Sequence, residues 1–196
     1  MSLLPYASLT HRRKAYRAGD VVLLSSQTAS GDSALSFTSG ITSTYGEYIF
    51  KFYNINPATD DANFQFQTST DGGSNYNLTV TSTFFFAYQT ENNSGAALTY
   101  QTGEDNAQQT SFQTISHDIG NGADESAAGE LHLFNPSSTT YVKHWYSRSI
   151  NMQSSNIAQD EYFAGYFNTT SDIDAVQFKM DSGNFDGTIK LWGVKN

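Results

Sequence analysis

The chain has 196 residues, of which 38% are hydrophobic and 14% aromatic, so it can form one domain with a substantial core. It contains no cysteine, which excludes disulfides, thiolate metal sites and cysteine nucleophiles. The net charge of -9 is unevenly distributed along the chain. Residues 1–18 carry four bases and no acid, whereas residues 19–196 carry six bases and 19 acids, a charge of 6 - 19 = -13. We expect this acidic body to repel nucleic acid.

The first element in chain order is a basic arm, residues 1–20, in which apolar residues precede the basic cluster. That order is the reverse of a secretory signal, and no apolar run approaches the roughly 20 residues that span a bilayer. We therefore expect no export by that route and no membrane insertion. We predict that the arm docks on an acidic protein surface, the bases guiding encounter and the apolar groups supplying affinity. The predicted docking residues are Leu3, Leu4, Tyr6, Leu9, Arg12, Arg13, Lys14, Tyr16 and Arg17. The alternative is a solvated tail.

Short strand signals recur after the arm, separated by turn clusters rich in Gly, Asn, Asp and Pro. The predicted strands are residues 21–27, 34–39, 47–56, 63–69, 77–89, 111–117, 130–134, 140–148, 161–167, 174–180 and 187–196. Helical signals are nearly absent. Many short strands without helices predict an all-β domain over residues 21–196, a two-sheet antiparallel β-sandwich of jelly-roll type.

Two of these strands carry the clearest patterns. In 47–56, Tyr48, Phe50 and Phe52 share one face, and the other face is also apolar, which indicates a central strand. The last ten residues, GTIKLWGVKN, alternate Ile189 and Leu191 with polar or aromatic neighbours. We predict that this segment closes the sheet and pairs with strands far away in the sequence.

The stretch 89–111 is long and polar, and we interpret it as a loop that is either a partner surface or a solvated cap. Tyrosine is enriched at interfaces, and sugar-binding sites use exposed rings. The candidate surface-ligand residues, all in or near polar segments, are Tyr76, Asn93 and Tyr100.

The sequence does not indicate an enzyme. His117-Asp118 is the one adjacent His-acid pair, but if the strand continues through it the two side chains point to opposite faces. No G-x-S-x-G motif is present. Asp124 and Glu125 are adjacent and do not form two facing acids. His132 alternates with Leu131 and Leu133, which favours a structural role over a metal ligand.

A cofactor is likewise not predicted, although calcium is kept as an alternative. The segment Asp71-x-Gly-x-Asn75 has oxygen ligands but lacks the distal bidentate Glu of an EF-hand loop. A tight turn, in which Asp71 bonds its own backbone, accounts for the same residues.

Four segments together carry a family resemblance: YGEYIFKFYNINPATDDANFQFQTSTDGGSNYN, ALTYQTG, LFNPSSTTYVKHW and FAGYFNTTSDIDAVQFKMDSGNFDGTIKLWGVK. The set, spread over residues 23–195, resembles virion structural proteins of tailed phages that are common among marine cyanophages. The resemblance implies a β-sandwich made in the bacterial cytoplasm and carried on the virion as a capsid decoration or tail-fibre accessory component.

The partners that this resemblance implies are other virion proteins of the capsid or tail. The expected function is therefore non-enzymatic and structural, with the arm as the attachment. The alternative is a host receptor- or glycan-binding module of a tail fibre. A homo-oligomer fits either reading, with a trimer favoured for a fibre-like protein.

Overall fold

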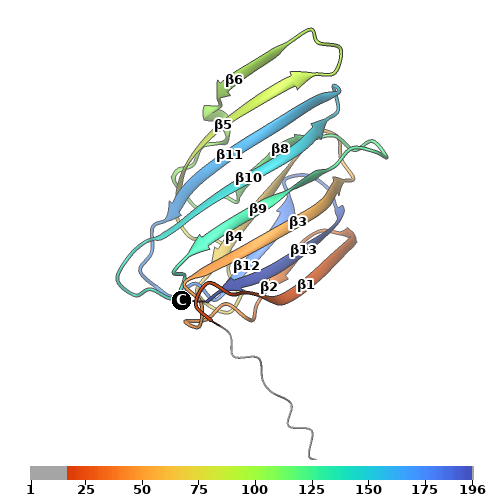
Figure 1. The fold of residues 1–196 in the computed structure, drawn as a ribbon. Coiled ribbons are helices and arrows are strands. Elements are labelled where there is room, and N and C mark those ends of the chain that lie inside the picture. Colours follow the sequence, from red (N-terminus) through yellow and green to blue (C-terminus); the bar gives the residue numbers. More distant parts are fainter. Residues whose placement is uncertain (1–16, 196) are drawn as a thin grey trace, which may run out of the picture.

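The structure, a computed structural model, describes residues 17–195 and consists of two antiparallel β-sheets (Figure 1). The elements are β1 (Val21–Asp32), β2 (Leu35–Phe37), β3 (Glu47–Pro57), β4 (Ala62–Ser69), β5 (Val80–Thr90), β6 (Ala96–Tyr100), the 3-10 turn η1 (Thr102–Glu104), β7 (Ala107–Gln109), β8 (Gln113–Ile119), β9 (Ala127–Phe134), β10 (Lys143–Gln153), β11 (Ile157–Phe167), β12 (Ala175–Met180) and β13 (Phe185–Val194). The described chain is all-β, as predicted.

The two sheets differ in size. The large sheet has nine strands in the order β1-β13-β3-β9-β10-β11-β5-β6, with β7 also paired to β5. The small sheet has four strands in the order β2-β12-β4-β8. Figure 1 shows the small sheet behind the large one, so that one face of the large sheet covers the core and the other faces away from it. We call these the inner and outer faces.

The core is a layer of aromatic rings between the sheets. Phe50 from β3 and Phe64, Phe66 and Phe178 from the small sheet are all fully buried. The Phe178 ring lies 5.2 Å from that of Phe50 and 5.7 Å from that of Phe64, so it links the sheets. Rings at such distances prefer offset or edge-on contacts, which fix their packing as well as burying area.

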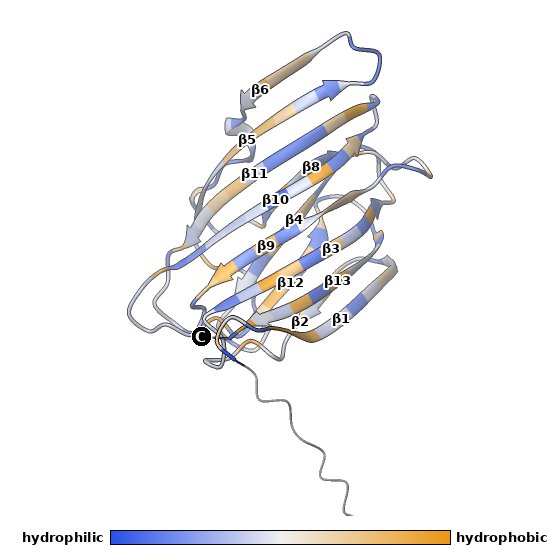
Figure 2. Ribbon diagram, in the orientation of Figure 1, coloured by the Kyte–Doolittle hydropathy of each residue, from blue (hydrophilic) through white to orange (hydrophobic). Residues whose placement is uncertain are grey.

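The sequence pattern placed these faces correctly. Tyr48, Phe50 and Phe52 are fully buried, and Tyr53 on the opposite face is exposed. The last strand, β13, pairs with both β1 and β3, which confirms that the end of the chain closes the sheet through distant partners. Figure 2 shows the resulting alternation of hydrophobic and hydrophilic positions along the strands.

The interpretation of 89–111 as one long loop was wrong. The segment contains β6 and β7, both paired to β5, with η1 between them. The signal was weak because β6 lies at a sheet edge and four of its five residues are exposed, so no buried stripe marks it.

Candidate functional site

The residues predicted from the sequence do not form one site. The predicted docking residues from Leu3 to Tyr16 lie outside the described residues. Arg17 is the first described residue, and its backbone N–H donates to Asp20 Oδ2 at 2.8 Å. Tyr76 is half-buried, and its hydroxyl is buried without a partner in the described part. Asn93 is at the β5–β6 turn, whereas Tyr100 ends β6 and bonds Asp105.

Asp71 forms the tight turn that its sequence predicts. Its Oδ1 accepts hydrogen bonds from the Ser69 hydroxyl at 2.6 Å and the Asn75 backbone at 2.9 Å. The hydrogen bond from the Asn75 side chain, followed by that from Ser69, lowers the pKa of Asp71 to about 2. Within residues 17–195, no group of three or more His, Asp or Glu side chains is placed to hold a metal ion.

The prediction for His117 and Asp118 was wrong in one respect. Strand alternation would separate the two side chains, but His117 Nδ1 lies 3.3 Å from Asp118 Oδ2. Asp118 has a positive φ of 53°, and β8 shifts its register against β4, so alternation fails at this point. Burial raises the pKa of Asp118, and the charges of Asp61 and Glu104 also act in that direction.

The outer face of the large sheet carries most of the exposed large apolar side chains of the described residues. Those on its strands are Val21, Leu23, Tyr53, Phe85, Leu98, Tyr100, Tyr146 and Ile150. On β3, β5 and β10 they alternate with the buried residues of the inner face. On β1 and β6 they lie opposite outward residues of β13 and β5 in the strand pairing. This face is therefore where the described part of the chain offers rings to a ligand.

A row of directly opposed residues crosses this face from β13 to β6. Its members, in order of pairing, are Lys190, Lys51, Glu130, Arg148, Tyr162, Phe85 and Tyr100. We call this set the cross-strand row. It combines charged groups at one end with stacked aromatic rings at the other, which no single stretch of sequence reveals.

Arg148 is the most constrained member of the row. Its Nε and Nη2 atoms donate to the two carboxylate oxygens of Asp160, both at 2.9 Å, in the bidentate geometry that suits a guanidinium. The guanidinium carbon lies 5.1 Å from the ring centre of Tyr162, whose ring stacks on Phe85 at 5.0 Å. The hydrogen bonds from Arg148 hold the pKa of Asp160 below its ordinary value.

His132 forms a second cluster beside the row. Its Nδ1 lies 2.5 Å from Glu47 Oε1 and its Nε2 lies 3.2 Å from Glu130 Oε1, while Tyr146 stacks on the ring at 4.5 Å. Burial raises the pKa of Glu130, but hydrogen bonds from His132 and Lys51 outweigh it and leave the pKa lowered. His132 points outward, in the direction that its alternation with Leu131 and Leu133 indicates.

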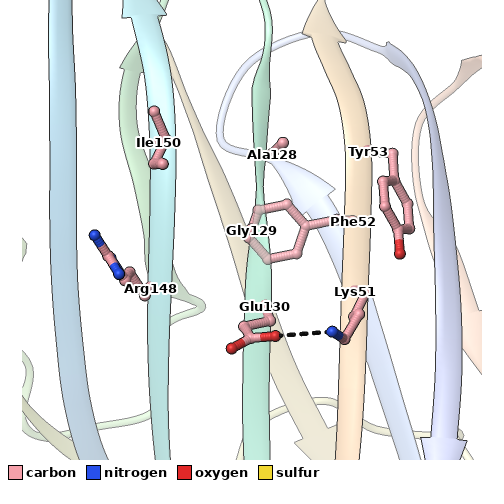
Figure 3. A pocket seen from close by; sticks show the side chains of 8 residues that line it. All are labelled: Lys51, Phe52, Tyr53, Ala128, Gly129, Glu130, Arg148 and Ile150. Carbon is pink, nitrogen blue, oxygen red and sulfur yellow. Dashed lines mark ion pairs between the residues drawn. The ribbon is translucent and has the colours of Figure 1, made fainter.

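Three shallow depressions lie side by side on this face. The first, of about 370 Å³, is lined by Lys51, Phe52, Tyr53, Ala128, Gly129, Glu130, Arg148 and Ile150 (Figure 3). A second, of about 300 Å³, shares Glu130 and Arg148 with the first. A third, of about 470 Å³, shares Tyr146 and Ala164 with the second. Because neighbours share walls, the depressions form a continuous line across the sheet.

Figure 3 shows how the first depression is built. Lys51 and Glu130 come from adjacent strands and form the ion pair drawn there, with Nζ 3.2 Å from Oε2. Tyr53 and Ile150 flank Ala128 and Gly129 from opposite sides. Small residues in β9 thus leave space between larger side chains of β3 and β10.

A buried carboxyl, Glu161, lies on the inner face. It accepts hydrogen bonds from Ser116 Oγ at 2.7 Å and from the His117 backbone at 2.8 Å. Burial raises its pKa to about 8, against the opposing effect of these bonds. The side chain is fully buried, so it joins the sheets and is closed to ligands.

Comparisons with known proteins give no assignment: no family model, curated protein or solved structure matches the chain. None of the helical structure among residues 17–195 is long and apolar enough to cross a membrane.

Proposed function

We propose that the protein is a non-enzymatic binding module whose outer face takes a neutral glycan of a host cell surface. The observation that carries this proposal is the line of three depressions, edged by aromatic rings and hydrogen-bonding groups. An open line of shallow depressions suits an extended chain of sugar units better than a compact small molecule, which prefers a deep pocket.

The chemistry of the face supports a sugar ligand. The exposed rings of Tyr146 and Tyr53 offer apolar surface to the C–H face of a pyranose, with a hydroxyl at one end. Lys51, Arg148 and Glu130 supply donors and acceptors for sugar hydroxyls between those rings. The net charge of -9 disfavours glycans that carry carboxylates or sulfates, so we commit to neutral ones.

The place of this module is proposed from sequence alone. The resemblance to tailed-phage virion proteins supports a location on the particle, attached to capsid or tail proteins through residues 1–20. A deletion of residues 1–18 tests that part separately, because it should abolish incorporation into particles and leave glycan binding by the remaining chain unchanged.

Glycan binding is tested by retention of the full chain on arrays of neutral and acidic oligosaccharides. We expect retention on neutral glycans, and at least a tenfold loss in affinity for Tyr146→Ala and for Arg148→Ala, which line two depressions each. Leu23→Ala is the control, since Leu23 is 47% exposed on the edge strand β1 and lies outside the three depressions. Retention on acidic glycans alone, or equal binding by all variants, would overturn the proposal.

A further inference from the structure

The edges of the two sheets are protected to different degrees. An open strand edge presents unpaired N–H and C=O groups, and proteins usually shorten, bend or cover such edges. In the small sheet, β2 has three residues, and β8 is covered: Ile115 O accepts a bond from Ser149 Oγ, and the His117 N–H donates to Glu161. In the large sheet, β1 is interrupted by two register shifts along its pairing with β13.

The edge strand β6 has none of these protections. Its sequence AALTY contains no charge and no proline, and it pairs with β5 in unbroken register. Leu98 at its centre is 73% exposed, and Tyr100 is 55% exposed. Among the sheet edges in the described part of the chain, β6 is thus the one that is paired in regular register and leaves its outer backbone groups uncovered.

The direction of the outward hydrogen-bonding groups follows from the pairing with β5. The Gln101 N–H donates to Phe84 O at 3.1 Å, and Gly95 O accepts from the Thr90 N–H at 2.9 Å. In an antiparallel pair, bonding residues alternate with residues whose backbone groups point away. Residues 97 and 99 therefore bond β5, and the outward residues are Ala96, Leu98 and Tyr100.

We propose that two copies of this protein join edge to edge by antiparallel pairing of their β6 strands about a twofold axis at Leu98. In that register Leu98 lies opposite the partner's Leu98, and Ala96 lies opposite the partner's Tyr100. The outward N–H and C=O groups of all three positions then find partners, and a small side chain meets a large one. The strand is self-complementary because no charge meets its like across the axis.

The pairing has a geometric consequence. A twofold axis perpendicular to the sheet makes one continuous sheet of two copies, with both outer faces on the same side. If the proposed function holds, the dimer presents two glycan sites to one surface, and the second site binds at high effective concentration. The proposed pairing involves β6 alone, so a failure to bind glycans would leave the dimer proposal standing, and a failure to dimerise would leave the glycan proposal standing.

Electrostatics oppose this dimer and supply a signature for it. Each chain has a net charge of -9, and two like-charged bodies repel at low ionic strength. Salt screens that repulsion, with a Debye length of about 8 Å at 0.15 M. Dimerisation should therefore strengthen as salt is raised, whereas an interface held by ion pairs would weaken.

The first test is the solution mass of the full chain by light scattering and sedimentation from micromolar to millimolar concentration. We expect a concentration-dependent dimer, at least tenfold weaker for Leu98→Lys, with an unchanged melting temperature. Val21→Lys is the matched control, because Val21 is 52% exposed on β1 at the opposite edge of the same sheet. A monomer or a trimer at all concentrations, or equal dimerisation of Leu98→Lys, would overturn the proposal.

The second test fixes the register. Opposed side chains in a hydrogen-bonded antiparallel pair lie on one face with Cα atoms about 5.5 Å apart, within reach of a short bismaleimide cross-linker. Since the chain has no cysteine, Leu98→Cys treated with this cross-linker should give a single covalent dimer, and Val21→Cys should not. A wild-type dimer that Leu98→Cys fails to cross-link would place the interface elsewhere and contradict the proposed pairing.

Discussion

The Oγ atom of Ser149 lies 2.7 Å from Oε2 of Glu161, in the closed space between the two sheets. The same Oγ lies 2.7 Å from the carbonyl oxygen of Ile115. A hydroxyl has one proton, so if Ser149 donates to Ile115, the proton in the contact with Glu161 must come from the carboxyl. The geometry fits a neutral Glu161, in agreement with burial raising its pKa to about 8.

The stability of the protein should therefore fall as pH rises through the interval from about 4.5 to about 8. In that interval the folded chain holds a proton on Glu161 that the unfolded chain releases, so deprotonation favours unfolding. The difference between the two pKa values corresponds to roughly 5 kcal/mol as an upper bound.

The substitution Glu161→Gln isolates this contribution. The amide keeps the shape and cannot ionise, so the variant should lose the decline in the free energy of unfolding and exceed the wild type in stability above pH 8. Urea unfolding of both proteins at pH 5, 7 and 9 measures the effect. Parallel pH profiles for the two proteins would show that Glu161 is already ionised in the folded state.

A buried lysine should be needed to hold two loops together. Lys143 is fully buried, and its Nζ donates to the carbonyl oxygens of Ser138, Tyr141 and Thr169. Lys143→Met leaves these carbonyls without their donor, and we expect a loss of about 3 kcal/mol in the free energy of unfolding. The control is Lys179→Met on β12, which should cost less than about 1 kcal/mol by the same denaturant measurement. Equal losses would refute the role of Lys143.

Gly165 should tolerate no side chain, because β11 and β5 approach each other closely there. A Cβ at this position would lie 2.4 Å from the Thr81 carbonyl oxygen and 2.8 Å from Trp145 Cζ2. We expect Gly165→Ala to cost about 1–3 kcal/mol, as overpacking does, and to lower the melting temperature by several degrees. Gly103→Ala, with nothing within 4 Å of its Cβ, should leave the melting temperature unchanged. An unchanged melting temperature for Gly165→Ala would show that β11 and β5 can move apart at this position at little cost.

Most of the fold could be predicted from the sequence because burial imposes alternation. All eleven predicted strands are present, and the phase of Phe50, Phe52 and Leu191 is as predicted. β6 and β7 were missed because edge strands bury little, and β8 was misread at Asp118 because its positive φ breaks alternation.

The candidate site could not be predicted in the same way. Lys51 of β3 and Glu130 of β9 become neighbours only through the pairing of strands that lie far apart in the sequence. A strand pattern indicates which residues point outward, but it contains no information on which strands lie side by side. The rings chosen from polar segments, Tyr76 and Tyr100, were selected by sequence neighbours alone and lie outside the line of depressions.

Glycan binding by the outer face can be tested at single-residue level by a backbone amide NMR titration of the isotope-labelled full chain. The titrants are neutral oligosaccharides of mannose, galactose, glucose and N-acetylglucosamine. We expect saturable shifts from at least one of them at residues 128–132, 146–150 and 160–164, which surround the line of depressions. Shifts confined to the β5–β6 turn, or no shift with any of these sugars, would show that the outer face does not bind neutral glycans.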